Sequence, residues 1–309
     1  MAWIRTGLEQ LTPRARGIAA ILLAVTLLSL SDALVKLSGD RFSLAQIVLL
    51  RSLVAGALIA AGLLAMGGPS ALRSRRTAWV RARSLSLAAM WLCYYAGLPS
   101  LSFALAAACY YTAPIWMALI ARFALGTPIG GTGWIAIGLS SLGVLLVVDP
   151  FSGKPALALV LPLAAAMFYA VSGTITWSRS REESAGAMAL DLNLCLVAVS
   201  GLGLLVLWVF EPGGGQGFVT ALWPTLEPAD IGLAALLGLF LAIITTLVAS
   251  AYRLAPTPVV GVFDTSYLGF AAFWSAILFH DPPGPIEAAG IALIALAGIL
   301  MTRRGAMGG

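Results

Sequence analysis

The chain has 309 residues, of which 60% are hydrophobic and only 10% are charged. A soluble domain carries roughly a quarter charged residues, so these side chains are too apolar to cover a water-facing surface of this size. The composition therefore excludes a soluble globular protein and predicts that lipid surrounds most of the chain.

A helix that crosses a bilayer needs roughly 20 mostly apolar residues. Ten segments meet this requirement, and no long polar region is left over for a soluble domain. The first segment carries Asp32 and Lys36 and precedes nine others, so we interpret it as a retained span and not as a cleaved signal. In chain order the predicted spans are 17–40, 43–67, 82–101, 104–123, 131–149, 156–177, 185–210, 229–252, 257–279 and 285–302.

Basic residues predict how these spans are oriented, because Lys and Arg collect in cytoplasmic loops. With a cytoplasmic N-terminus, fourteen of them fall on the cytoplasmic side and only Arg41 and Lys154 on the other. We therefore expect a multi-pass protein of the bacterial inner membrane with both termini in the cytoplasm. The net charge of +5 is then a topology signal, concentrated at 73–83, and no nucleic-acid partner is expected.

Two stretches of the chain share an order of a polar-aromatic helix, a short Pro-containing loop and a helix that ends near a glycine. Thr112 of the first stretch corresponds to Thr265 of the second, and Gly143 corresponds to Gly298. The repeat unit of about 150 residues spans five helices, and an odd number of spans inverts the second copy. The sequence thus predicts an all-α integral membrane fold of ten transmembrane helices. They form two inverted five-helix repeats, residues 1–153 and 154–309.

The repeat region resembles the drug/metabolite transporter superfamily, in particular its ten-helix EamA-type members, over residues 17–302. Two positions depart from the family pattern. Thr127 and His280 stand near a position that is commonly Glu, and Tyr267 stands where the first repeat has Pro114. The features that carry the resemblance are Pro114, Leu125-Gly126, Leu278-Phe279, Gly143, Gly298 and Arg51.

Within this superfamily the chain is similar to bacterial aromatic amino acid exporters of the YddG kind, through overall likeness and aromatic-rich middle helices. That likeness implies export of aromatic and other neutral amino acids and related metabolites from the cytoplasm. It implies alternating access to a central cavity, with no cofactor. A carrier for another small metabolite or drug is the alternative within the superfamily.

Ionisable side chains inside spans are costly and usually face a cavity or a partner. Asp32 and Lys36 are four residues apart, so they either form an internal ion pair or meet a substrate's charged end. Arg51 either holds a carboxylate or braces the bundle against Asp32 or a helix end. Asp264 either binds an ammonium group or a proton, or makes an internal hydrogen bond to a neighbour. Asp191 is expected to pair with a basic residue at the cytoplasmic boundary, Arg179 or Arg181.

Aromatic residues are concentrated in the third, fourth, sixth and ninth spans, several of them deeper than the interfacial belts that Trp and Tyr normally form. A tyrosine at this depth needs a partner for its hydroxyl. A cavity lined by tyrosines suits ring-bearing or apolar substrates, and ordinary helix packing is the alternative. The predicted substrate-binding residues are Tyr95, Tyr110, Tyr111, Tyr169, Asp264, Tyr267, Trp91, Lys36 and Asp32.

Other functional classes fit the sequence less well. A membrane enzyme would need a metal cluster or a nucleophile beside a base, whereas the chain has one histidine, His280, and three cysteines in spans without metal-site spacing. A channel is disfavoured by the inverted repeat. The expected partners are a small-molecule substrate and the lipid bilayer, and the oligomeric state stays open, with a monomer as one alternative.

Overall fold

The computed structural model describes residues 12–124, 126, 130–148, 156–180, 182–210, 215–254 and 263–304. Every regular element within these ranges is helical. The α-helices are α2 (Pro13–Leu37), α3 (Leu44–Gly67), α4 (Thr77–Gly97), α5 (Phe103–Tyr110), α6 (Ala113–Ala124), α7 (Gly131–Val148), α8 (Ala156–Arg179), α9 (Ala185–Phe210), α10 (Pro228–Leu254), α12 (Tyr267–Leu278) and α13 (Pro285–Arg304). Two short 3-10 helices are η1 (Pro69–Leu72) and η2 (Leu98–Ser100).

Six helical stretches in the described residues are long and apolar enough to cross a membrane. They are α2, α3, the α5–α6 stretch, and all or most of α8, α9 and α10. Shorter apolar stretches come from α7, α12 and α13. The first turns of α4 carry Arg81 and Arg83, which make this helix more polar. The apolar helices support a multi-pass membrane protein.

Two of the predicted spans are broken in the structure. The span predicted at 104–123 divides into α5 and α6 at Tyr111 and Thr112, and the one predicted at 257–279 has a turn at 265–266, just before α12. Its residues 257–262 lie outside the described ranges. The first of these two spans is still long and apolar enough to cross a membrane as a whole, over Phe103–Ala124.

Local chemistry explains both breaks. Thr112 Oγ1 donates to the Cys109 carbonyl at 2.8 Å, and Ser266 Oγ donates to the Phe263 carbonyl at 2.6 Å. Such hydroxyl contacts offer the backbone an alternative to helical bonding. At the first break Pro114 also lacks the N–H that would continue the helix onto the Tyr110 carbonyl. The two breaks overlap at one pair of the repeat alignment, Thr112 and Thr265.

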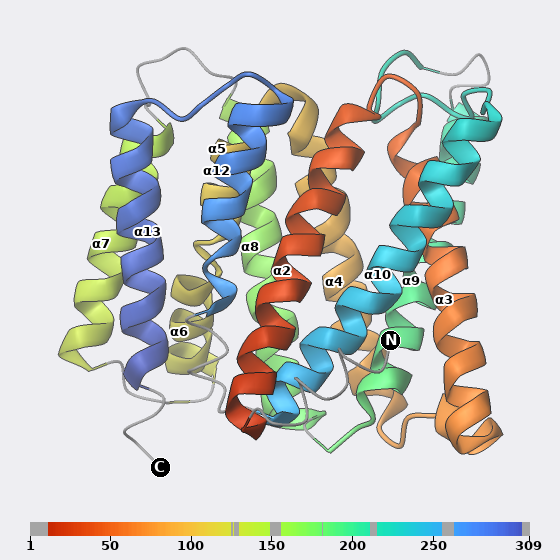
Figure 1. Ribbon diagram of the computed structural model, residues 1–309, viewed down its shortest axis with the longest axis horizontal. Coiled ribbons are helices and arrows are strands. Elements are labelled where there is room, and N and C mark those ends of the chain that lie inside the picture. The colour runs from red at the N-terminus through yellow and green to blue at the C-terminus, as the bar shows by residue number, and fades with distance from the viewer. Residues whose placement is uncertain are drawn as a thin grey trace.

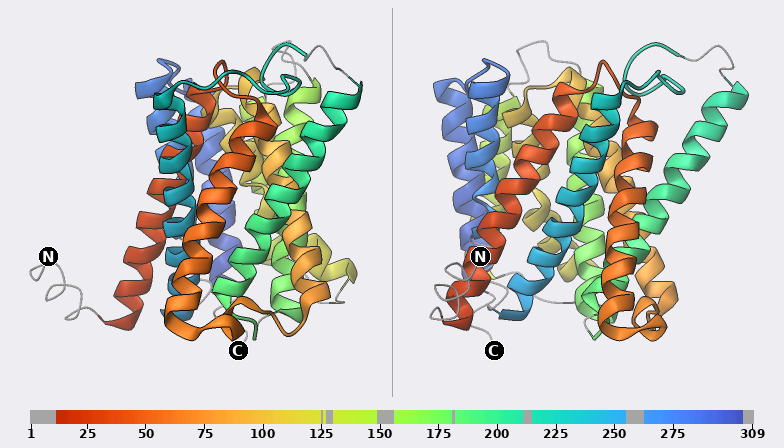
Figure 2. Two further views of the ribbon diagram at one scale, coloured as in Figure 1. Left: turned by 90° about the vertical axis from the view of Figure 1, so that its right-hand side faces the viewer. Right: turned by 45° about the vertical axis from the view of Figure 1, so that its right-hand side comes forward.

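The helices form two side-by-side groups, which Figures 1 and 2 show from different directions. The first, here the α7–α13 group, contains α5, α6, α7, α12 and α13. The second, the α3–α9 group, contains α2, α3, α4, α8, α9 and α10. Each group draws helices from both parts of the chain. The groups meet where α2 packs on α12 and where α8 packs on α5 and α6.

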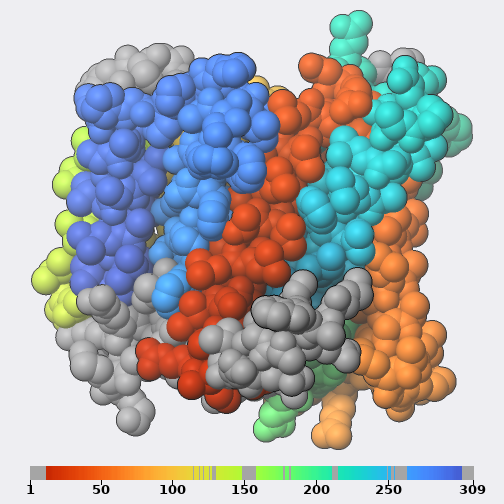
Figure 3. Space-filling model, viewed as in Figure 1, coloured from red at the N-terminus to blue at the C-terminus, as the bar shows by residue number. Residues whose placement is uncertain are grey.

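Within the α7–α13 group, α7 and α13 approach each other through glycines. A Cβ atom on Gly143 would lie 2.7 Å from the Gly290 carbonyl oxygen, and one on Gly290 would lie 2.6 Å from the Gly143 carbonyl oxygen. Only residues without a side chain permit this backbone contact, which is a common way for membrane helices to associate. Figure 3 shows α13, α12, α2 and α10 side by side across one face of the molecule.

Polar contacts fasten the α3–α9 group at both ends of its helices. At one end, Arg41 forms an ion pair with Asp230 at 2.9 Å, and Gln46 Nε2 donates to the Pro224 carbonyl at 2.9 Å. At the other, Arg81 pairs with Asp191 at 2.8 Å. The predicted partner of Asp191 was therefore wrong, because Arg179 lies over the Trp79 ring instead. Arg181 lies outside the described residues.

Candidate functional site

Asp32 is the polar centre of the contact between the two helix groups. Its side chain lies on α2 and is buried, with 3% of its surface exposed. Tyr95 of α4 donates its hydroxyl to Oδ1 at 2.9 Å, and Tyr267 of α12 donates to Oδ2 at 2.6 Å. One carboxylate therefore joins three helices, and Tyr267 is its link to the α7–α13 group.

Arg51 supplies the positive charge that compensates Asp32. It is 1% exposed on α3, and its Nη1 donates to the Tyr95 hydroxyl. The guanidinium also lies over the rings of Trp91 and Tyr95, 4.5 and 4.7 Å from their centroids. This is the bracing alternative expected from the sequence, with Tyr95 as the bridge. Arg51 Nε and Nη2 have no hydrogen-bond partner among the described residues.

Lys36 does not pair with Asp32, although the two share a helix face. Its ammonium donates to the carbonyls of Leu98 and Leu101 and lies 5.3 Å from the Phe279 ring centroid. The internal ion pair expected from the four-residue spacing was therefore wrong. The long side chain of Lys36 reaches instead the irregular connection between α4 and α5, where carbonyls lack helical partners.

Five tyrosines form a continuous aromatic cluster beside Asp32, here the tyrosine cluster. Tyr111 and Tyr267 stack with ring centroids 5.2 Å apart, and the hydroxyls of Tyr94 and Tyr267 lie 3.2 Å apart. Tyr110 makes the other contacts, with centroids 5.4 Å from Tyr94 and 5.5 Å from both Tyr111 and Tyr169. The members are Tyr94, Tyr110, Tyr111, Tyr169 and Tyr267.

Four of these tyrosines were among the predicted binding residues, and Tyr94 was not. Tyr94 and Tyr95 are neighbours on α4, so their side chains point about 100° apart. The structure directs Tyr95 to Asp32 and Arg51 and Tyr94 into the tyrosine cluster. Trp91 packs on Arg51, away from the cluster contacts, so its spacing from Tyr94 does not predict which of the two tyrosines joins the cluster.

Asp264 lies at the second helix break, beside the tyrosine cluster. Its backbone carbonyl accepts a hydrogen bond from the Tyr111 hydroxyl at 3.2 Å. Its side chain is partly exposed, and no described residue makes a hydrogen bond or ion pair with the carboxylate. Ser266, one of the neighbours that could have bonded to the carboxylate, donates its hydroxyl to the Phe263 carbonyl instead. Asp264 is thus an available acid next to aromatic rings.

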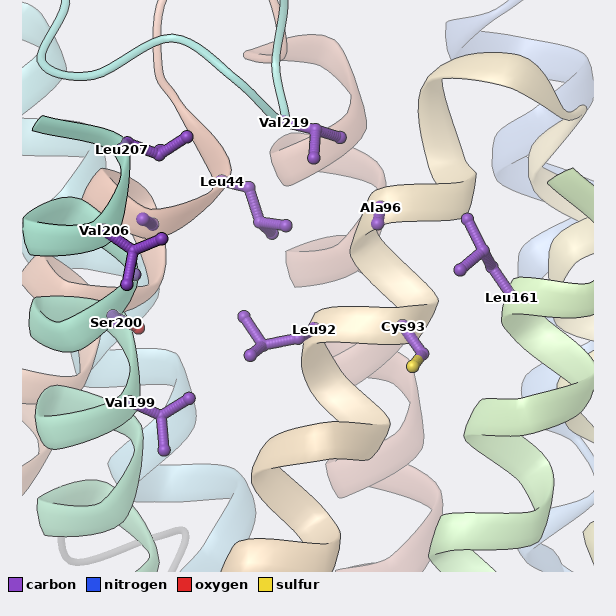
Figure 4. Close-up of a pocket in the computed structure, with 12 residues that line it drawn as sticks. Leu44, Leu92, Cys93, Ala96, Leu161, Val199, Ser200, Val206, Leu207 and Val219 are labelled. Carbon is purple, nitrogen blue, oxygen red and sulfur yellow. The ribbon is translucent and has the colours of Figure 1, made fainter. Parts of the chain in front are cut away.

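A separate cavity of about 420 Å³ lies between α3, α4, α8 and α9. Figure 4 shows Val199 and Val206 of α9 facing Leu92 of α4, whereas Cys93 lies on the side of α4 nearer Leu161 of α8. Apolar side chains form nearly all of its lining, and no ionisable acid or base contributes. Its lining therefore lacks the tyrosines and acids that distinguish the site around Asp32. Among the described residues, no group of three His, Cys, Asp or Glu side chains is placed to hold a metal ion.

Comparisons with known proteins agree with this fold. Residues 15–149 match the EamA-like transporter family. A riboflavin transporter of Rhizobium johnstonii is 27% identical over 226 residues, which are 73% of this chain and 70% of that protein. A crystal structure that is 20% identical superposes with a TM-score of 0.64, covering 94% of this chain and 97% of the other, and shows a shared fold.

None of these matches supports a specific likeness to the aromatic amino acid exporters. The EamA match and the transporter-named relative point to a transporter and not to an enzyme. Together with the apolar helices, they support a multi-pass membrane transporter for small molecules, whose residues 15–149 are similar to the EamA-like transporter family.

Proposed function

We propose that the chain is an inner-membrane carrier that exports ring-bearing amino acids and related metabolites by alternating access. In this proposal ten spans form two inverted repeats, 1–153 and 154–309, with both termini in the cytoplasm. The two helix breaks support the arrangement, because they overlap at one pair of the repeat alignment. Discontinuous helices at corresponding places in two halves are the usual location of a transporter's binding site.

One observation carries the substrate class: the available Asp264 carboxylate lies beside the tyrosine cluster at these breaks. A carboxylate that has no hydrogen-bond or ion-pair partner among the described residues is suited to an ammonium group. Tyrosine rings offer stacking surfaces for an aromatic side chain, and their hydroxyls offer polar contacts. We assign Tyr110, Tyr111, Tyr169 and Asp264 to substrate contact. Asp32, Lys36, Trp91, Tyr95 and Tyr267 shape the site from around it.

A flavin-like substrate is the second candidate, favoured by the likeness to the Rhizobium riboflavin transporter. A planar ring system without an ammonium group would use the tyrosine cluster but not the charge of Asp264. The two candidates therefore differ in how they depend on this residue. A third possibility, a channel, differs from both because its flux does not saturate.

The test is uptake into liposomes that hold the purified protein, with labelled phenylalanine, threonine, riboflavin and a sugar phosphate. Protein-free liposomes give the background, and excess unlabelled solute tests for saturation. We expect saturable phenylalanine flux. Riboflavin flux alone would replace the amino acid assignment with the flavin one. Flux of the sugar phosphate alone, or of none of the four solutes, would refute both substrate assignments.

A further inference from the structure

The hydroxyl hydrogens around Asp32 can all be assigned from donor counts. A tyrosine hydroxyl has one hydrogen to donate. Tyr267 gives its hydrogen to Asp32 Oδ2, so the contact with Tyr94 at 3.2 Å requires Tyr94 to be the donor. Tyr95 gives its hydrogen to Oδ1 and accepts one from Arg51, which has only donors. With Asp32 ionised, every donor in this arrangement therefore points toward its carboxylate.

The hydrogen bonds at the two carboxylate oxygens of Asp32 differ in whether they can accommodate a proton. On the Oδ1 side, Tyr95 already accepts from Arg51, and a guanidinium cannot reverse its bond to become an acceptor. On the Oδ2 side, the Tyr267 hydroxyl can turn its hydrogen toward Tyr94 and accept from the carboxyl group. A proton therefore fits on Oδ2, facing α12, and not on Oδ1, facing α4.

Protonation at Oδ2 weakens the hydrogen bond that joins α2 to α12. Hydrogen bonds to an ionised group are roughly twice as strong as those between neutral groups. The bond with Tyr267 would lose this charge assistance, whereas Tyr95 would keep its charged donor, Arg51. The remaining polar contact between the two helices is Trp274 Nε1 donating to Ser29 Oγ at 3.1 Å, which involves no charge. The α12 contact is therefore the one that a proton would release.

Protonation of Asp32 also leaves the charge of Arg51 unbalanced. Once Asp32 is neutral, the buried guanidinium keeps its charge without the acid that balances it, and its Nε and Nη2 remain without described partners. An uncompensated buried charge is costly. Protonation therefore disfavours the packing of α12 on α2 that the structure shows. The other acids near this contact do not take over that role. Asp230 of α10 is paired with Arg41, and Asp264 is linked to the cluster through its backbone carbonyl, which accepts from Tyr111. Lys36 is a cation and is engaged with carbonyls.

We propose that Asp32 is the binding site for a coupling proton, whose uptake on Oδ2 frees α12 from α2 and lets the α7–α13 group move against the α3–α9 group. Only the carboxylate gains a proton in this step, and no other covalent bond forms or breaks. The proposal makes the protein a proton-coupled carrier and rests on the proposed transport function. Substrate and proton then use separate acids, Asp264 and Asp32.

Spin-label distances test this proposal without any substrate. The three native cysteines are replaced with alanine, and labels are placed on Ile231→Cys of α10 and Ile277→Cys of α12, which are 59% and 52% exposed. This pair joins the two helix groups. The control pair, Ile231→Cys with Leu202→Cys of α9, lies within the α3–α9 group. Distances are measured in liposomes at about pH 5 and about pH 8.

We expect the α10–α12 distance distribution to change between the two pH values, while the control pair stays constant. Asp32→Asn, a neutral mimic of similar shape, should give the acidic distribution at both values. Tyr267→Phe should do the same with Asp32 intact. An α10–α12 distribution that ignores pH in the wild type, or still follows pH in Asp32→Asn, would overturn the proposal. A distance change as expected together with failed uptake of every tested solute would refute the substrate assignment and leave the proton site standing.

Discussion

Two helix pairs, α7–α13 and α2–α12, are held together in opposite ways. The first pair uses glycines, with backbone atoms so close that a Cβ at Gly290 would lie 2.6 Å from a carbonyl oxygen. The second uses a buried carboxylate that accepts from tyrosines. Backbone contact offers a single arrangement, whereas hydrogen bonds to an ionisable group depend on its charge. We therefore expect α7 and α13 to move as one unit and the α2–α12 contact to be the one that changes.

The largest expected loss of unfolding free energy comes from removing Arg51, the cation that balances Asp32 at the α2–α12 contact. Arg51→Met removes the cation that faces Asp32 through Tyr95, which leaves a buried acid without compensation. Breaking a buried pair in this way costs about 3–5 kcal/mol. Unfolding in mixed detergent micelles at neutral pH would measure the loss. Combining Arg51→Met with Asp32→Asn should recover much of it, and an additive double variant would argue against the pairing.

A smaller loss is expected from Tyr267→Phe, which deletes one donor to Asp32 without changing the ring contact to Tyr111. A hydrogen bond to a charged group contributes about 1.5–3 kcal/mol. The cost should be largest at alkaline pH, where Asp32 is ionised, and should shrink as the acid becomes protonated. Unfolding measured across a pH series, with wild type alongside, gives the comparison. An equal cost at every pH would contradict the charge dependence of this contact.

The glycine contact should lose about 1–3 kcal/mol through overpacking in Gly290→Ala. The added Cβ would meet the Gly143 backbone, which cannot rotate away. Because no titrating group is involved, this loss should not vary with pH. Gly138→Ala on α7 is the matched control, since nothing lies within 4 Å of its added Cβ. Similar stabilities for the two variants would show that the α7–α13 approach is not tight.

The smallest effect is expected at the helix ends. Arg81 is 52% exposed where it pairs with Asp191, and exposed ion pairs contribute about 0–1 kcal/mol. Arg81→Gln should therefore leave the unfolding midpoint nearly unchanged and the spin-label response to pH intact. A large loss of stability in Arg81→Gln would show that the ion pair at the helix ends, and not the α2–α12 contact, is the principal polar contact.

The apolar runs predicted most helices closely. The runs at 43–67 and 185–210 became α3 and α9, because unbroken apolar sequence in lipid must satisfy its backbone within a helix. The helix breaks were missed, since side-chain hydroxyls that bond carbonyls leave hydropathy unchanged. Pro114 marks the first break, but no proline marks the turn at Thr265 and Ser266.

The site was only partly predicted from the sequence, because its contacts join residues that are far apart in the chain. Local spacing placed Asp32 and Lys36 on one face, but their partners come from residues more than sixty positions away. The tyrosines were found because their depth in the spans is visible in the sequence. Which tyrosine would meet Asp32, and which would stack beside Asp264, depends on how α4 and α12 are rotated against α2, and one sequence does not encode that rotation locally.

The central claim, that Asp264 and the tyrosine cluster bind an amine-bearing ring, is tested most directly by phenylalanine flux in matched liposomes. Wild type, Asp264→Asn and Asp230→Asn are compared, the last removing an acid whose partner is Arg41 at the helix ends. We expect saturable phenylalanine flux for wild type and Asp230→Asn, and no saturable phenylalanine flux for Asp264→Asn. Unchanged phenylalanine transport constants in Asp264→Asn would contradict the claim.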